Sequence, residues 1–316
     1  TIQLQMTLVG DRTLTTNTGA VTINGSIDDG GASHGLIKAG NGTLTLNGTN
    51  SFTGGITVDA GTIVLSGISP TGGGEPIILN NGSTLHLAGT TVTNDIIVPV
   101  GATVYLYKTV GTNVVNGRLT GGGSINESTG SGTFPAIHWN NDNSGFTGSI
   151  VSNGGSSHRW RFNTPEAGSA SAAWILNSTA TDGYGFNFGS NSTISFGALS
   201  GSGYFRNNGN GSATMRIGDL GTHTTMSGTT MFAIGIVKAG EGTLTLSGPG
   251  FFHSNPTTVS AGTLNVTGAI ATSPVTVENA ATLSGTGSLG GTVTLNSGGN
   301  LSPGNGGAGA TGNLTL

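Results

Sequence analysis

The chain has 316 residues, of which 60 are glycine and none is cysteine, and its formal net charge is −4. Charged residues make up 7% and hydrophobic residues 34% of the chain. This composition excludes a disordered tail, which combines low hydrophobicity with high net charge. It also excludes disulfides and thiolate metal sites. The weak negative charge predicts no nucleic-acid partner, and the lack of a long apolar run predicts no membrane insertion.

Short strands of the form Gly-Thr-apolar-x-apolar recur along the chain. They are GTLTL (42–46), GTIVL (61–65), GSTLHL (82–87) and GATVYL (101–106), and later GTLTL (242–246), GTLNV (262–266), GTVTL (291–295) and GNLTL (312–316). The alternation gives each strand one apolar and one polar face. The first apolar residues of the early strands lie 19, 22 and 19 positions apart, so we expect these four to stack: Leu44, Ile63, Leu85 and Val104.

A strand this short cannot bury its apolar face alone, but coils of about 20 residues can stack so that equivalent strands pair. The sequence therefore predicts an all-β fold, a right-handed single-stranded parallel β-helix (β-solenoid) of roughly 15 coils. We expect one continuous solenoid over 1–316. It would have regular coils in 1–133, irregular aromatic-rich coils in 134–205 and regular coils in 206–316. Residues 134–205 hold 12 of the 18 aromatic residues.

One long unit occurs twice. LIKAGNGTLTLNGTNSFTGGITVDAGTIVLSG (36–67) resembles the autotransporter-associated β-strand repeat, also called the passenger-associated transport repeat. A second copy at 236–268 matches from Lys238 to Gly248 and then departs at PGFFHSNPTTV, while DNSGFTGSIV (142–151) resembles half of a degenerate copy. The resemblance implies a secreted or surface-displayed β-helical stalk, often exported as the passenger of an autotransporter, and hence an extracellular or bacterial cell-surface location.

Two of the three lysines, Lys38 and Lys238, occupy the same position in the two copies. They could contact a ligand or react covalently, or they could face solvent at the edge of a coil with their stems over apolar surface. Because a building unit repeats and a catalytic site does not, we expect the solvent-facing arrangement.

Catalysis and metal binding have little support in the sequence. A polysaccharide-degrading β-helix needs clustered carboxylates, and the chain has one acidic doublet, Asp28–Asp29, with His34 nearby. The doublet lies in a glycine-rich stretch, so turn residues are the better interpretation. The six histidines show no metal-ligand spacing. We therefore expect no enzyme activity, no cofactor and no metal.

The segment SSHRWRF is the most distinctive candidate for binding. Alternation on a strand would place Arg159 and Arg161 on one face and Trp160 and Phe162 on the other. These four residues could form a glycan- or partner-binding stripe through stacking and arginine forks. Alternatively, the aromatics fill a wide coil while the arginines face water, which is the interpretation we favour.

Both ends of the sequence read as uncapped coils with apolar residues, namely Ile2, Leu4, Met6 and Leu8 at the start and Leu314 and Leu316 at the end. Solenoid ends normally carry caps. Either the solenoid continues in a longer protein, or the ends of two molecules associate head to tail into a filament.

The sequence as a whole favours a non-catalytic extracellular structural protein. It would be a rigid stalk, an adhesin passenger or a fibre subunit. The alternatives are a module that binds a glycan or a host or cell-surface ligand through the aromatic-rich middle region, and, less favoured, a polysaccharide-degrading enzyme.

Overall fold

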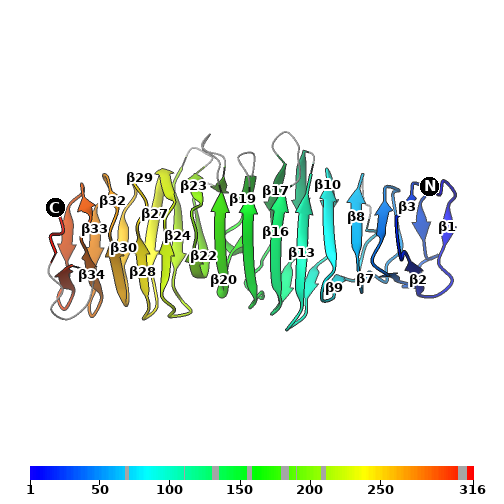
Figure 1. Ribbon diagram of the computed structural model, residues 1–316, viewed down its shortest axis with the longest axis horizontal. Coiled ribbons are helices and arrows are strands. Elements are labelled where there is room, and N and C mark those ends of the chain that lie inside the picture. The colour runs from blue at the N-terminus through cyan, green and yellow to red at the C-terminus, as the bar shows by residue number, and fades with distance from the viewer. Residues whose placement is uncertain are drawn as a thin grey trace. The chain divides into compact units, whose positions relative to one another are not determined.

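The computed structural model describes residues 1–67, 71–109, 111–129, 135–154, 159–178, 185–189, 191–207, 211–304 and 312–316 (Figure 1). The chain divides into two compact units, Thr1–Asn153 and Gly154–Leu316. The expected boundary at 133/134 falls outside the described residues, so the three-part division of the solenoid stays a prediction.

The first unit consists of short strands. They are β1 (Met6–Thr7), β2 (Arg12–Thr15), β3 (Ala20–Ile23), β4 (Ile27–Asp28), β5 (Leu36–Ala39), β6 (Thr43–Leu46), β7 (Ile56–Val58), β8 (Thr62–Ser66), β9 (Ile77–Leu79), β10 (Thr84–Ala88), β11 (Thr91–Val92), β12 (Ile96–Val98), β13 (Thr103–Lys108), β14 (Thr112–Val115), β15 (Leu119–Gly121), β16 (Ser124–Thr129), β17 (Ala136–Trp139) and β18 (Ser149–Gly154). The strand orders in its sheets are β3-β6-β8-β10-β13-β16-β18, β15-β12-β9-β7-β5-β2, β11-β14-β17 and β1-β4.

The second unit repeats the plan and adds one short 3₁₀ turn, η1 (Pro165–Ala167). Its strands are β19 (Arg159–Phe162), β20 (Ser169–Ser178), β21 (Phe186–Phe188), β22 (Ser192–Ser200), β23 (Tyr204–Asn207), β24 (Ala213–Ile217), β25 (Thr224–Met226), β26 (Thr229–Phe232), β27 (Ile234–Lys238), β28 (Thr243–Leu246), β29 (Phe251–His253), β30 (Thr257–Val259), β31 (Thr263–Val266), β32 (Ala269–Ile270), β33 (Val275–Val277), β34 (Thr282–Gly285), β35 (Ser288–Leu289), β36 (Val293–Leu295) and β37 (Asn300–Pro303). The sheet orders are β20-β22-β24-β27-β30-β33-β36, β19-β21-β23-β26-β29-β32-β35 and β25-β28-β31-β34-β37.

Each unit is a parallel β-solenoid, which confirms the predicted fold class. Strands that pair come from successive coils and run parallel, for example β6 with β8 and β28 with β31. The two units together contain about 13 turns, fewer than the roughly 15 coils expected from the length of the repeat. The last expected strand, at 312–316, makes an isolated parallel bridge between Ser288 and Thr315 instead.

The predicted apolar column forms with one change of partner. Leu44 pairs with Ile63, and Ile63 pairs with Leu85, but Leu85 pairs with Leu106. Val104 instead pairs with Ile125, so its predicted place in the column was wrong by two residues. A shift of two keeps the same face of a strand buried. Alternation in the sequence therefore could not distinguish Val104 from Leu106.

The two units fill their interiors differently. The first unit buries aliphatic rows such as Leu46, Leu65 and Leu87, all with 0% exposure. The second unit stacks aromatic rings, with the centroid of Phe162 lying 5.9 Å from that of Trp174 and 5.6 Å from that of Phe196. Aromatic side chains fill more volume per residue than aliphatic ones.

Candidate functional site

The repeated lysines are buried corner residues and not solvent-facing ones, so the sequence-based expectation was wrong. Lys38 is 0% and Lys238 is 1% exposed. The Lys38 ammonium donates to the carbonyl oxygens of Ala39 (3.0 Å) and Gly40 (2.6 Å), and to that of Ala60 (2.9 Å) one coil further on. Three N–H donors thus meet three backbone acceptors, which joins two successive coils at a corner.

Lys238 reproduces this arrangement in the second unit. Its ammonium donates to Ala239 O (2.6 Å), Gly240 O (2.7 Å) and Ala261 O (3.1 Å). Burial lowers the pKa of Lys38, and it lowers the pKa of Lys238 to about 8 against the opposing effect of the nearby carboxylates. The carbonyl contacts give both side chains a structural part in the corner. Sequence reasoning missed it because a lone lysine on an apolar face resembles an exposed one.

The acidic doublet organises a turn. Asp29 is buried, and its carboxylate accepts hydrogen bonds from the backbone N–H (2.8 Å) and hydroxyl (2.8 Å) of Thr53 and from the backbone N–H groups of Gly31 (2.9 Å) and His34 (3.2 Å). The Thr53 backbone hydrogen bond is the largest cause that lowers the pKa of Asp29 to about 2. This supports the turn interpretation of Asp28–Asp29.

One histidine lies in a buried polar chain that the sequence did not reveal. His253 Nδ1 lies 2.8 Å from Thr230 Oγ1, and its Nε2 lies 2.9 Å from Thr257 Oγ1, which in turn lies 3.0 Å from Ser273 Oγ. Burial lowers the pKa of His253 to about 4, so the imidazole is neutral at pH 7. Within the part of the chain that the structure describes, no group of three or more His, Asp or Glu residues could hold a metal ion.

Residues 156–158 of the SSHRWRF segment lie outside the described residues, and the described part, Arg159–Phe162, splits between core and surface. Trp160 and Phe162 on β19 are both 0% exposed and point into the aromatic core, whereas Arg159 and Arg161 are half-buried on the outer face. A ligand on the surface could therefore reach the two arginines but not the two aromatic rings. Whether these residues bind anything stays a prediction.

Register extends the outer face of β19 across the second unit. Arg161 pairs with Asn187, Asn187 with Arg206, Arg206 with Met231, and Met231 with Phe252. We call these five residues the arginine row. The sequence did not indicate Arg206 or Phe252 as members, because only the strand register brings segments nearly a hundred residues apart onto one line.

Two exposed phenylalanines mark one end of the arginine row. Phe252 is 55% and Phe232 is 56% exposed, and the guanidinium of Arg206 lies 5.6 Å from the centroid of the Phe232 ring. Phe232 has φ 65°, a left-handed conformation that a bulky side chain rarely adopts. Such strain costs on the order of 1–3 kcal/mol and tends to occur at functional sites.

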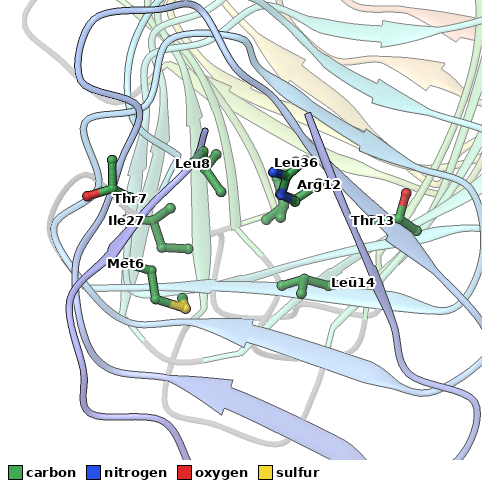
Figure 2. Close-up of a pocket in the computed structure, with 8 residues that line it drawn as sticks. All are labelled: Met6, Thr7, Leu8, Arg12, Thr13, Leu14, Ile27 and Leu36. Carbon is green, nitrogen blue, oxygen red and sulfur yellow. The ribbon is translucent and has the colours of Figure 1, made fainter. Parts of the chain in front are cut away.

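A second surface feature lies at the first coils of the first unit. The pocket there has a volume of about 410 Å³. Its lining residues, drawn in Figure 2, include Met6 on β1, Leu8 just after β1, Leu14 on β2, Ile27 on β4 and Leu36 on β5. Among the predicted assembly residues, Leu4 and Leu316 are strongly exposed and Ile2 is just exposed, whereas Met6 and Leu314 are half-buried and Leu8 is buried. Self-association through these residues stays a prediction.

The corner lysines lie within two stretches that match a known family model. Residues 36–65 and 236–266 match the passenger-associated-transport-repeat model. The chain carries two passenger-associated transport repeats. The predicted resemblance is thereby confirmed, and in both repeats the buried lysine closes the corner between the first two strands. The repeats support the expected extracellular, surface-exposed location.

A longer similarity covers most of the chain. The chain is 28% identical over 267 residues to the adhesin BmaC autotransporter of Brucella suis biovar 1 (strain 1330), which covers 77% of this chain and 7% of that protein. The chain therefore spans only a small fraction of its relative's length. No solved structure shows a significant match to the chain. No helix among the described residues is long and apolar enough to cross a membrane.

Proposed function

We propose that the chain is a non-catalytic, adhesin-like segment of an extracellular passenger, in which the solenoid is a rigid support and its outer face contacts a ligand. The observation that carries this proposal is the similarity to an autotransporter adhesin over 77% of the chain. The part of Asp29 in a turn supports a non-catalytic interpretation, because its carboxylate is already occupied by four donors.

The ligand-contact surface in this proposal consists of Arg159, Phe232 and the members of the arginine row other than Asn187, whose side chain is buried. All three lysines of the sequence are buried, so arginines supply the positive charge of the surface. Arg159, Arg161 and Arg206 share one outer face with two exposed phenylalanines, and such exposed aromatic rings commonly mark interaction sites.

An acidic glycan is the ligand class that best fits this chemistry. Arginine forks bind carboxylate or sulfate groups, and aromatic faces stack on the apolar faces of sugar rings. Arg161 and Arg206 lie two coils apart, so a linear polymer could contact both by running across the strands, with about 4.8 Å between successive coils. The protein as a whole carries a weak negative charge, so the arginine row is a local region of positive charge on its surface.

Binding to immobilised polysaccharides tests the proposal. We expect the chain to bind an acidic polysaccharide such as heparin more tightly than a neutral one such as dextran, with binding that weakens as salt rises. Arg161→Ser combined with Arg206→Ser should reduce binding at least about tenfold, since each charge-assisted hydrogen bond contributes roughly 1.5–3 kcal/mol. Phe252→Ser should weaken binding without changing the β-content measured by circular dichroism.

The matched control removes the same charge from another surface. Arg12→Ser combined with Arg118→Ser also lowers the net charge by two but changes the first unit, so we expect nearly full binding. Equal losses for both double variants would mean that binding depends on net charge alone, and binding that is insensitive to all of these changes would exclude the arginine row. A chain that binds a protein receptor and no glycan would exclude the glycan class.

Head-to-tail self-association is a second proposal, supported by the apolar pocket at the first coils and the exposed side chain of Leu4. Burial of apolar surface would favour the contact. We expect the molar mass measured by light scattering to rise with protein concentration and Leu4→Ser to reduce that rise. A constant monomer mass at high concentration would contradict self-association and would leave the ligand-binding proposal unaffected.

A further inference from the structure

The first unit contains a buried pair of opposite charges that belongs neither to the arginine row nor to the corner lysines. Lys108 lies at the end of β13 and Glu127 lies on β16, one coil further along. The Lys108 Nζ contacts the Glu127 Oε1, and both side chains are 0% exposed. The Ser152 hydroxyl donates to the Glu127 Oε2 at 2.6 Å, so the carboxyl group is held on both sides.

The pair is buried between apolar strand partners on one side and a serine on the other. Lys108 pairs across the sheet with Leu87, and Glu127 pairs with Leu106, both of which are buried, while Ser152 is the other strand partner of Glu127. A charged pair in such a place loses its hydration, and the mutual attraction seldom recovers the loss in full. Burial lowers the pKa of Lys108, although the attraction of Glu127 opposes that shift. Transfer of one proton from the ammonium to the carboxylate would give a neutral amine beside a carboxylic acid, which removes both buried charges.

We propose that Lys108 and Glu127 condense to an amide bond that covalently links two successive coils. The paired strands hold the amine and the carboxyl group in contact. Such fixed proximity can correspond to an effective concentration on the order of 10⁵–10⁸ M. The absence of solvent at both side chains disfavours hydrolysis of the product.

The reaction balances without a further reactant. The lone pair of the Lys108 nitrogen forms a bond to the Glu127 Cδ while negative charge develops on Oε2, where the Ser152 hydroxyl donates its hydrogen bond. The Cδ–Oε1 bond then breaks. Oε1 leaves as water with the proton of the carboxyl group and one proton from the nitrogen, and nothing is oxidised or reduced.

Such a bond would be a covalent cross-link between coils in a chain that cannot form disulfides. The chain has no cysteine, so no disulfide can join its coils. The corner lysines contact backbone carbonyl oxygens and no carboxyl group, so the same reaction is not expected at Lys38 or Lys238. They serve as internal controls for Lys108.

Intact-mass spectrometry of the folded, purified full chain tests the proposal. We expect a mass lower than that of the sequence by one water molecule, and unchanged by denaturation or reduction. Trypsin should then fail to cleave after Lys108 and should release a branched peptide in which residues 39–118 are joined to residues 119–159. Cleavage after Lys38 and Lys238 should proceed normally in the denatured protein.

Variants separate the link from other losses of water. Lys108→Met and Glu127→Leu should each show the full sequence mass, whereas Lys38→Met should still lose one water molecule. Ser152→Ala should slow the mass loss after refolding several-fold, and an unchanged rate would overturn the part assigned to Ser152. A folded wild-type chain at full sequence mass, with ordinary tryptic cleavage after Lys108, would overturn the proposal.

Discussion

Buried lysines at the corners show how a single residue can join neighbouring coils. An ammonium has three donors, and a corner of the solenoid presents three carbonyl oxygens from two coils; of those at Lys38, the Ala39 oxygen also accepts from the backbone N–H of Thr16 at 2.9 Å. In both repeats Lys38 and Lys238 supply these donors at 2.6–3.1 Å. A buried carbonyl without a partner is costly, so the lysine stabilises the corner although its own burial is unfavourable.

Replacing a corner lysine tests this account of the repeat. We expect Lys38→Met and Lys238→Met each to lower the free energy of unfolding by about 1–3 kcal/mol, because methionine fills the space but leaves buried carbonyl oxygens without donors. Urea unfolding followed by circular dichroism measures the change. Arg12→Met changes an exposed cation and should have little effect, and similar stabilities for all three variants would contradict the structural role of the lysines.

The buried histidine predicts a dependence of stability on acid. The pKa of His253 is about 4 in the folded chain and 6.5 ordinarily. The unfolded chain therefore binds more protons between these values, so stability is full above pH 6.5 and falls as the pH drops towards 4. The loss approaches about 3 kcal/mol.

Unfolding measured across this range tests the prediction, with His253→Gln as the comparison. The variant should be less stable at pH 7 but should show a flatter profile between pH 6.5 and 4. The lowered pKa of Asp29, about 2, adds a separate loss of stability only below about pH 4. Parallel profiles for the variant and the wild type above pH 4 would contradict the assignment to His253.

At the scale of the element, stacked coils require glycine where corners approach one another. Gly61 has φ 69°, and a Cβ there would lie 2.5 Å from the carbonyl oxygen of Gly40 on the preceding coil. Gly262 meets the carbonyl oxygen of Gly240 at the same distance in the second repeat. The glycines of the repeat therefore serve both the backbone angle and the close approach of two corners.

A pair of glycine variants separates these two effects. Gly82 has φ 81° but no atom within 4 Å of an added Cβ. Gly82→Ala should therefore lower the free energy of unfolding only by the cost of a left-handed conformation, about 1–2 kcal/mol. Gly61→Ala should lower the free energy of unfolding by about 1–3 kcal/mol more, because the added methyl group collides with the neighbouring coil. Thermal unfolding compares the two variants, and equal losses would mean that the corners do not constrain each other.

The strands and the repeat could be predicted from the sequence, whereas register and corner chemistry could not. Alternation over 42–46 and 61–65 indicated both the strands and the buried leucines and isoleucines. It could not tell Val104 from Leu106, because both lie on the same face. It also could not reveal that Lys38 turns inward, since the acceptors are backbone carbonyl groups that every sequence contains.

The arginine row shows the same limit for the candidate site. The pattern RWRF correctly indicated two faces, but Arg161 and Arg206 belong to strands that only pairing through β21 brings into line. The buried contact of Lys108 with Glu127 likewise depends on register. From the sequence SINEST alone, Glu127 would be predicted to be exposed, because its strand partner is not known. The contacts that distinguish this chain are thus the ones set between coils.

At the scale of the whole molecule, the chain divides its few charges between two places. The three lysines lie inside and join coils, whereas the arginines lie outside, where three of them share one face of the second unit. This division fits the proposed function, in which the interior resists unfolding and the surface contacts a ligand. Both the buried lysine contacts and the arginine row depend on one physical feature, the in-register stacking of successive coils.

Disulfide formation between engineered cysteines tests that stacking most directly, because the native chain has no cysteine. His86 pairs with Tyr107 on the outer face of neighbouring coils, and paired residues lie about 4.8 Å apart, within reach of a disulfide. His86→Cys combined with Tyr107→Cys should therefore oxidise readily, whereas His86→Cys combined with Tyr105→Cys, shifted by two residues, should not. The stacked solenoid would be contradicted if the shifted pair oxidised efficiently, or if neither pair oxidised.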